Sequence, residues 1–221
     1  MNSHAFQFHG ALLHALPSGA LHWPEARVLV VSDLHLGKSA RLAEAGGAAL
    51  PPYDTQETLN TLESDIFLSD AAHVICLGDS FDSAAIAGAL PDREKLWITR
   101  LQAGRRWSWI EGNHDPGPLE LGGSHHKALQ INGLWFRHIA SPDAAGEVSG
   151  HYHPKARLTV RGRRFSLPCF LLDSRRLILP AYGAYTGGLF CDGPVLSALM
   201  DSDAQAILTG PRPVAIPMPR G

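Results

Sequence analysis

The stretch Val28-Leu29-Val30-Val31-Ser32-Asp33-Leu34-His35-Leu36-Gly37 decides the fold, because an apolar run passes directly into a polar loop. Consecutive large aliphatic residues are typical of a strand that is buried on both faces of a sheet. Asp33 and His35 are two positions apart, so both side chains point the same way from an extended chain. The stretch therefore predicts an interior strand whose carboxyl end carries a carboxylate and an imidazole.

The rest of the first half alternates such strands with helices. Residues 54–57 (DTQE) have the pattern of a capping box, with Asp as N-cap and Glu at position N3, and they predict the start of a helix. That helix is expected to turn Leu59, Leu62 and Phe67 inward, and a second helix is expected over Arg93–Ala103. This alternation favours an α/β sheet with covering helices. The expected interior strands are Arg27–Val31, His73–Leu77, Trp107–Ile110 and Leu134–Phe136.

The second half and the N-terminus have a different pattern. Asn132-Gly133 and Arg161-Gly162 lie between short apolar or mixed runs and are hairpin signals, so the second half is expected to be mostly antiparallel. The stretch Ala5–Trp23 is expected to add edge strands to the same core. The tail 210–221 contains four prolines, which predict an extended or frayed end. The whole chain, 1–221, is expected to form one domain.

Composition limits the function classes. The chain is 45% apolar and 18% charged, no run approaches the ~18 apolar residues of a spanning helix, and the N-terminus does not look like a secretory signal. A cytoplasmic protein without membrane contact is the expectation. Three cysteines without close spacing exclude a disulfide framework and a CxxC zinc site. A formal net charge of −2 means that local patches or bound metal must hold any polyanion.

Polar clusters follow other expected strands, in the same way that Asp33 and His35 follow the strand that ends at Val31. Each cluster alone is more often a turn or a surface pair. Four clusters at four strand ends predict a shared site, because ligands gather at the carboxyl ends of strands in sheets with covering helices. The other three clusters are Gly78-Asp79-Ser80-Phe81-Asp82, Gly112-Asn113-His114-Asp115 and Gly150-His151-Tyr152-His153-Pro154.

These clusters, over about Val28 to Pro154, resemble the signature of the calcineurin-like metallophosphoesterases. The stretches Pro168–Asp173 and Arg175–Gly188 resemble more narrowly a bacterial branch of that family, the ligase-associated DNA damage response endonucleases. The resemblance implies an α/β fold of two packed mixed β-sheets flanked by helices, a four-layer sandwich. It also implies two divalent metal ions and hydrolysis of phosphoesters.

Carried over position by position, the resemblance assigns metal ligands. The assigned ligands are Asp33, His35 and His153 for one ion, Asn113, His138 and His151 for the other, and Asp79 as a bridge. His125 and His126 are rivals of His138, because many relatives have a His-Gly pair where this chain has His138-Ile139. We prefer His138, which follows an expected strand, whereas His125 and His126 follow two glycines in an expected surface loop. This oxygen and nitrogen donor set favours Mn²⁺, with Fe and Zn as alternatives.

The chemistry that the resemblance implies is attack by a metal-bridged hydroxide. Two ions ~3.5–4 Å apart neutralise phosphate oxygens and lower the pKa of a bridging water toward ~7. His114 resembles the residue that contacts the substrate and protonates or stabilises the leaving oxygen, with Asp82 or Asp115 orienting its ring. Turn formation is the alternative role for Asp82 and Asp115. Tyr182 either lines the cleft, where it would contact substrate beside Asn113 and His114, or packs beside a glycine turn.

The substrate depends more on the resemblance than on the residues. The narrower branch implies DNA as substrate, beside a DNA ligase, a helicase and an exonuclease in DNA repair, with a homo-oligomer left open. A phosphodiesterase or phosphatase acting on cyclic nucleotides or other small molecules would have the same ligands, and a non-catalytic scaffold would have no need of His114. Candidate phosphate or base contacts, all with solvation or packing as the plainer role, are Arg105-Arg106, Arg161, Arg163-Arg164, Arg175-Arg176, Trp23, Trp107, Trp109 and Trp135.

Overall fold

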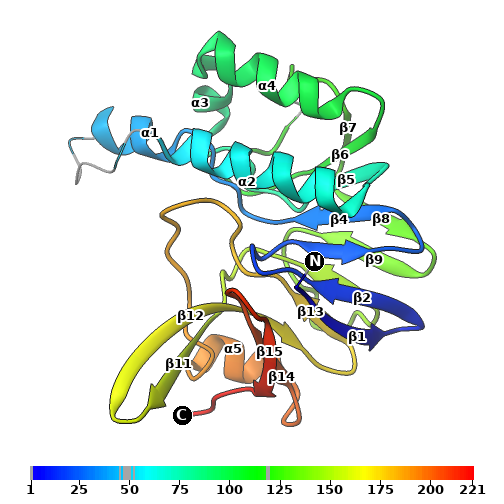
Figure 1. Ribbon diagram of the computed structural model, residues 1–221, viewed down its shortest axis with the longest axis vertical. Helices are drawn as coiled ribbons and strands as arrows, with labels where there is room; N and C mark the ends of the chain where they lie inside the picture. Colours follow the sequence, from blue (N-terminus) through cyan, green and yellow to red (C-terminus); the bar gives the residue numbers. More distant parts are fainter. Residues whose placement is uncertain (1, 45, 47–50, 52, 118–119) are drawn as a thin grey trace.

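The computed structural model describes residues 2–44, 46, 51, 53–117 and 120–221, and its first sheet has seven strands in sequence order (Figure 1). The first four strands pair antiparallel, and the last four pair parallel. The N-terminal stretch thus adds edge strands, as expected. The strands are β1 (His4–Phe8), β2 (Ala11–Ala15), β3 (Leu21–Trp23), β4 (Val28–Val31), β5 (His73–Cys76), β6 (Arg106–Ile110) and β7 (Ser124–His126).

The second sheet has eight strands and is mixed, and most of its strand pairs are antiparallel, as expected. Strand β10 lies parallel to both β9 and β13, whereas the other pairs are antiparallel. The path runs β15-β14-β12-β13-β10-β9-β8, and β11 pairs with β12 alone. The strands are β8 (Ala128–Ile131), β9 (Leu134–Arg137), β10 (Glu147–Ser149), β11 (Lys155–Val160), β12 (Arg163–Leu172), β13 (Arg176–Ile178), β14 (Gln205–Leu208) and β15 (Val214–Pro217).

Helices cover the outer faces, so the layers are helix, sheet, sheet and helix (Figure 1). Side chains from both sheets, such as Val30 of β4 and Phe136 of β9, form a shared apolar layer between the sheets. A second cluster packs α2 and α4 on the first sheet, and a third packs α5 on the second sheet. The helices are α1 (Lys38–Glu44), α2 (Asp54–Ser69), α3 (Ala84–Ala89), α4 (Asp92–Gln102) and α5 (Pro194–Leu199). The structure confirms the expected sandwich of two mixed sheets with flanking helices.

The predicted interior strands are confirmed, with one difference in burial. Strands β4 and β5 are buried along their whole length, and β6 is buried from Trp107 onward. Strand β9 instead alternates buried and half-buried residues, because it lies next to the edge strand β8. The expectation that His125 and His126 lie in a loop is wrong. Both belong to β7, which lies parallel to β6.

Helix α2 begins at the expected residue but for a different reason. The Asp54 carboxylate accepts hydrogen bonds from the backbone and hydroxyl of Ser39, and Tyr53 takes the N-cap position without a side-chain bond. Leu59 and Leu62 are buried, whereas Phe67 is 83% exposed. The inward placement of Phe67 was therefore wrong. Five positions beyond Leu62, at 3.6 residues per turn, place Phe67 about 140° away from the buried face.

Both predicted hairpin turns are confirmed. Asn132 and Gly133, with φ of 46° and 89°, join β8 to β9, and Arg161 and Gly162, with φ of 50° and 76°, join β11 to β12. Two successive left-handed residues are the geometry that matches the twist of a tight hairpin. The three cysteines are free thiols, and two of them pack with Sγ atoms 3.5 Å apart between β12 and the segment before α5. Among the helices of the described residues, none is long and apolar enough to cross a bilayer.

Candidate metal centre

The polar clusters predicted from sequence follow the carboxyl ends of five strands that belong to two sheets. Parallel strands β4, β5 and β6 end at one edge of the first sheet, and parallel strands β9 and β10 end beside them in the second. The polar residues and their strands are Asp33 and His35 after β4, Asp79 and Asp82 after β5, Asn113 and His114 after β6, His138 after β9, and His151 and His153 after β10. Strand direction therefore brings distant loops together.

One group of donor atoms consists of Asp33, His35 and His153, whose ligand atoms lie within 4.8 Å of one another. Nε2 of His153 is 3.0 Å from Oδ1 of Asp33 and 3.4 Å from Nε2 of His35. Asp33 is fully buried, and its other oxygen accepts the hydroxyl of Ser32 and the amide of His151. The carboxylate is thus fixed on one side and directed at two imidazole nitrogens on the other.

A second group consists of Asp79, His138 and His151. Nε2 of His138 lies 3.3 Å from Oδ2 of Asp79 and 3.2 Å from Nδ1 of His151. The amide oxygen of Asn113 is 2.9 Å from the same Nε2. The structure thus brings together all seven residues to which the resemblance gave a ligand role, and it places His138, not His125 or His126, beside Asp79.

The backbone at these residues is strained. Asp33, His35, Asp79, His151 and His153 all have positive φ, between 45° and 71°. Left-handed geometry is uncommon for side chains of this size and clusters at functional sites. The backbones of two of these loops also approach each other closely, because a Cβ on Gly112 would lie 2.1 Å from the amide nitrogen of Asp79. The loops are therefore held in conformations that serve the side-chain arrangement rather than local backbone preference.

The tautomers of two histidines fit metal binding. Nδ1 of His138 lies 2.8 Å from the carbonyl oxygen of Leu77, which can only accept a hydrogen bond, so Nδ1 carries the proton of a neutral ring. Nε2 of that ring then presents a lone pair. That lone pair faces the oxygens of Asp79 and Asn113, which are also acceptors. His35 repeats the arrangement, with Nδ1 donating to Asp82 at 3.0 Å. Converging lone pairs need a cation, and a ligating histidine commonly donates its other N–H to a carboxylate or carbonyl in this way.

An unpaired buried oxygen supports the same fit. Oδ1 of Asp33 accepts no hydrogen bond from the described residues, although it is buried and 3.0 Å from a His153 nitrogen. Buried carboxylate oxygens are paired with donors or with metal in stable proteins. The carboxylate, amide and imidazole donors of the two groups are those that Mn²⁺, Fe and Zn accept.

The carboxylates differ in their electrostatics. Burial opposes ionisation of Asp79, but hydrogen bonds from His138 and the His114 amide outweigh it and bring the pKa of Asp79 to about 2. Burial is likewise outweighed at Asp82, where His35 and Arg41 bring the pKa to about 2. Burial and the nearby Asp79 raise the pKa of Asp115 to about 6. Asp79 and Asp82 are therefore anionic at neutral pH.

The carboxylates of Asp82 and Asp115 do not orient the His114 ring, and Asp115 instead has the alternative role in forming a turn. The Asp82 carboxylate accepts from His35 and from Arg41, and only its backbone carbonyl faces Nδ1 of His114, at 3.2 Å. Asp115 accepts the backbone amides of residues 79, 80 and 81 and shapes that loop. Sequence reasoning missed Arg41, whose only signal is its position on the helix that follows His35. It also missed Ser32, which precedes the first aspartate.

His114 is placed at the open side of the two groups. Its backbone amide donates to Oδ1 of Asp79 at 2.9 Å, and its Nε2 is 4.0 Å from Oδ2 of the same carboxylate. The side chain is 41% exposed, against 4% for Asp79. The imidazole therefore borders the donor atoms while remaining accessible from solvent.

Burial excludes several candidate substrate contacts and confirms packing as their role. Tyr182 is 6% exposed, and its hydroxyl donates to Asp65 at 2.8 Å, so it packs in the core rather than lining a cleft. Trp23, Trp107 and Trp109 are buried as well and cannot stack on bases. Trp135 is partly exposed but lies against the guanidinium of Arg137.

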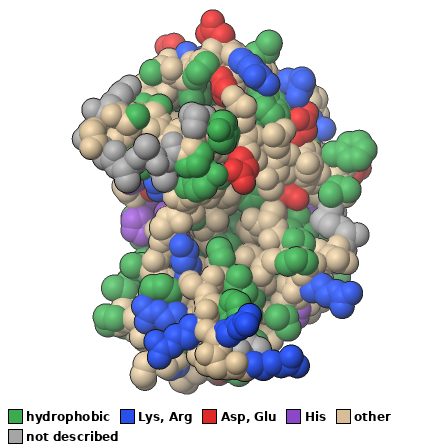
Figure 2. Space-filling view, turned by 60° about the vertical axis from the view of Figure 1, so that its left-hand side comes forward, with side chains coloured by type: hydrophobic (Ala, Val, Ile, Leu, Met, Phe, Trp, Pro, Cys, Tyr) green, Lys and Arg blue, Asp and Glu red, His purple; other side chains and the backbone are tan. Residues whose placement is uncertain are grey.

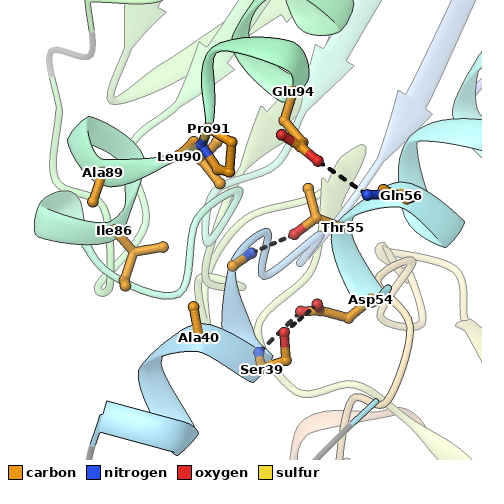
Figure 3. A pocket seen from close by; sticks show the side chains of 11 residues that line it. Ser39, Ala40, Asp54, Thr55, Gln56, Ile86, Ala89, Leu90, Pro91 and Glu94 are labelled. Atoms are coloured by element: carbon orange, nitrogen blue, oxygen red, sulfur yellow. Dashed lines mark hydrogen bonds between the residues drawn. The ribbon is translucent and has the colours of Figure 1, made fainter. Parts of the chain in front are cut away.

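An open groove of about 510 Å³ borders the second group of donors. Asn113 and His138 line one side, and Lys127 and Arg137 contribute cationic side chains. A smaller cavity of about 160 Å³ lies between α1, α2, α3 and α4, behind the loop that follows His35 (Figure 3). There Thr55 accepts the amide of Gly37, which ties the start of α2 to that loop. The groove, not this smaller cavity, meets the donor atoms.

Comparisons with known proteins agree with this geometry. A family model described as calcineurin-like phosphoesterase matches residues 26–195. A solved structure, described as the crystal structure of Pseudomonas putida nuclease MPE, is similar to this chain with 29% sequence identity and a TM-score of 0.73. The similarity covers 96% of this chain and 100% of that chain. A search of curated proteins gave no match.

Proposed function

Because this chain belongs to the calcineurin-like phosphoesterase family, we propose that it is a metal-dependent nuclease that hydrolyses DNA phosphodiesters. The observation that carries the proposal is the pair of Asp/His groups at the strand ends, with Asn113 and His114 between them and solvent. Similarity over the full length of a solved nuclease supports DNA as substrate. The open groove supports a long substrate, because a polymer cannot enter an enclosed cavity.

The proposal gives the two groups one metal ion each. Asp33, His35 and His153 would hold one, Asn113, His138 and His151 would hold the other, and Asp79 would contact both, with Mn²⁺ as the favoured ion. Such a pair supplies Lewis acidity, charge neutralisation at phosphate and a water that ionises near neutral pH. The identity of the ion rests on donor chemistry alone.

The remaining residues position groups and move a proton. Asp82 holds the Nδ1 proton of His35, and Arg41 holds Asp82 in turn, so that Nε2 of His35 keeps its lone pair toward the site. The backbone carbonyl of Asp82 faces Nδ1 of His114 and leaves Nε2 of that ring directed at the open side. In the proposal the doubly protonated ring of His114 keeps its Nδ1 proton on the Asp82 carbonyl and donates its Nε2 proton to the leaving oxygen, a role that needs an accessible imidazole.

The setting that we propose is DNA repair, with endonucleolytic cleavage. Support for it comes from the C-terminal stretches 168–173 and 175–188, which resemble the repair endonuclease branch. Action beside a DNA ligase, a helicase and an exonuclease is proposed from the same resemblance, and a cytoplasmic location is proposed from the composition.

The proposal is tested by metal-dependent turnover on substrates of different topology. Purified protein is stripped with a chelator, loaded with Mn²⁺, Fe²⁺ or Zn²⁺, and assayed on circular single-stranded DNA, linear DNA, bis(p-nitrophenyl) phosphate and cyclic nucleotides. Linearisation of the circle is the expected result. Turnover of cyclic nucleotides without DNA cleavage would contradict the nuclease and indicate a small-molecule phosphodiesterase instead. The absence of turnover on every ester would contradict a hydrolytic function.

A further inference from the structure

The hairpin formed by β11 and β12 is the most cationic segment of the chain. Residues 154–172 contain five Lys or Arg side chains and no Asp or Glu, whereas the whole chain has a formal net charge of −2. The five are Lys155, Arg157, Arg161, Arg163 and Arg164. The rest of the molecule is therefore net acidic, and positive charge is concentrated on one projecting element. Local charge of this kind, not the global charge, governs contact with a polyanion.

The base of the hairpin is anchored by internal contacts. Nζ of Lys155 donates to the carbonyl of Thr186, and Arg157 pairs with Asp192 at 3.3 Å and lies over the ring of Phe190. Ala156 is fully buried in the apolar cluster under α5. These contacts fix the direction in which the hairpin leaves the body of the protein.

The outer end of the hairpin has no such contacts. Arg161, Arg163 and Arg164 are exposed, and none of their guanidinium groups has a hydrogen bond or ion pair with any residue that the structure describes. Most arginines of the other predicted basic pairs are used internally: Arg176 is buried and donates to the carbonyl of Pro142, and Arg105 donates to the carbonyl of Leu101, whereas Arg106 is exposed. Three unpaired guanidinium groups within four residues are thus particular to this turn.

An exposed aromatic ring shares a strand face with one of these arginines. Phe165 is 49% exposed and pairs across the hairpin with Leu158, two positions from Arg163 on the same face. Burial of a large apolar side chain away from water lowers the free energy. A ring that is exposed on a cationic strand is therefore suited to a ligand with both negative charge and a flat apolar surface. Unstacked nucleotides have both properties.

The hairpin starts at the metal centre. Lys155, the first residue of β11, is two positions after His153, and six residues of strand lead outward from it. At about 3.3 Å per residue the turn lies roughly 17 Å or more from the donor atoms. Figure 2 shows Lys and Arg side chains gathered at the lower end of this face, over the hairpin, whereas Asp and Glu side chains lie mainly in the upper half.

We propose that the turn of the β11–β12 hairpin binds single-stranded DNA, with Arg161, Arg163 and Arg164 on phosphates and Phe165 stacked on a base. This inference rests on the proposed nuclease function and names the surface that holds the strand away from the metal centre. A single strand is the partner, because the bases of a duplex are already stacked on each other and offer no face to Phe165. Arginine is suited to the phosphates by its fork of donors.

Binding without metal is the direct test. Anisotropy of a labelled single-stranded oligonucleotide of about 20 nucleotides, longer than the ~4–16 that one such surface covers, is measured in chelator at several salt concentrations. The triple variant Arg161→Asn/Arg163→Thr/Arg164→Thr removes the charges, with Asn chosen for the φ of 50° at position 161 and Thr for strand positions. Its salt slope should fall by about 2, because each single-strand phosphate contact contributes ~0.7. Affinity at low salt should fall by at least about tenfold.

Phe165 is tested separately. Phe165→Ala should weaken binding of the single strand by about fivefold or more, and Phe165→Tyr, which keeps the ring, should bind like the unmodified protein. The matched charge control is Arg93→Ala/Lys95→Ala/Arg100→Ala on α4, at the opposite end of the molecule (Figure 1). That variant loses three cations from a helix and should change the salt slope little.

The outcomes are separable from those of the proposed function. Hydrolysis of bis(p-nitrophenyl) phosphate by metal-loaded hairpin variants should be unchanged, which also shows that they are folded. If the hairpin variants lose DNA binding but the unmodified protein hydrolyses no ester, the binding surface is supported and the nuclease proposal is contradicted. An unchanged salt slope in the hairpin variant, an equal loss in the α4 variant, or tighter binding of duplex with no effect of Phe165→Ala would overturn the inference.

Discussion

At the scale of single residues, the site depends on which nitrogen of each histidine carries the proton. His35 and His138 each donate from Nδ1 to an oxygen acceptor, which leaves Nε2 as the donor atom toward the site. Residue types and spacing predicted which side chains meet. They did not predict the hydrogen bonds that fix these rings, because no local pattern marks Arg41, on helix α1, or Leu77, directly after β5, as a partner of the site.

His114→Ala should keep both metal ions and lower the hydrolysis rate by at least ~10²-fold, the scale of a proton-transfer group. The reason is that the His114 ring borders the donor atoms without being among them. Metal content of the purified variant and its rate on a diester with a poor leaving group give the result. A diester with a p-nitrophenyl leaving group should suffer less, because that leaving group needs no proton. Equal losses on both diesters would contradict the assignment.

Asp82→Asn should weaken metal binding rather than remove a catalytic group. An amide can still accept from Nδ1 of His35, but it has no charge to hold Arg41 or to polarise the ring. Loss of such outer partners typically costs ~10–100-fold in metal affinity or activity. Isothermal titration calorimetry measures the metal affinity of the variant. Saturating metal should restore most of its hydrolysis rate. A rate that stays low at full metal occupancy would give Asp82 a direct role in the reaction.

At the scale of elements, the sequence predicted the buried parallel strands and the N-terminal edge strands, but it missed β7 at the opposite edge of the first sheet. Continuous aliphatic runs such as Val28–Val31 have one stable environment, between two covered faces, so their pattern is informative. Strand β7, with the sequence Ser-His-His, has no apolar pattern and forms only because β6 offers an open edge. The same limit explains Phe67, since an aromatic residue near the end of a helix can point to solvent when no second element covers it.

The pairing of β5 with β6 should make folding stability depend on pH through His73. Burial, with smaller contributions from Arg106 and His126, lowers the pKa of His73 from 6.5 to about 4, and its Nε2 lies 2.9 Å from Ser108 of β6. The unfolded chain takes up a proton below pH 6.5, and the folded chain does not until about pH 4. Stability is therefore fully present above pH 6.5 and falls with decreasing pH, by about 2 kcal/mol between pH 7 and pH 5.

Urea unfolding of metal-free protein at both pH values measures this effect. In His73→Gln the decrease in the free energy of unfolding between the two pH values should be smaller by that amount, whatever the substitution costs at pH 7. Comparison with the unmodified protein cancels the titration of the histidines in the metal centre. An identical pH dependence in the two proteins would show that His73 does not stay neutral in the fold.

At the scale of the whole molecule, each donor group combines residues from both sheets. Asp33 and His35 follow a strand of the first sheet and His153 follows one of the second, and Asp79 faces His138 and His151 in the same way. The shared apolar layer holds the sheets together over their area, and bound ions would join them at one edge. Sequence order alone indicated that the clusters converge, but only the packing of the two sheets determines which cluster faces which.

Metal loading should therefore raise the melting temperature, because ligands that bind only the folded state stabilise it by mass action. At a free metal concentration ~100 times the dissociation constant the gain is about 2.7 kcal/mol for one site. Differential scanning calorimetry with and without chelator tests it, and Asp79→Asn should abolish most of the metal-dependent shift. The same shift in that variant would mean that the ions bind elsewhere.

Ligands that come from both sheets have a consequence for the protein in a cell that is short of metal. The ion-free chain would lack its activity and would also open more often at the seam between the sheets. Proteases act on opened chains, so a decrease of one or two kcal/mol can lower the amount of a protein several-fold. Metal starvation would then deplete this enzyme by turnover of the protein itself, and resupply of the ion would restore activity only as fast as new chains are synthesised.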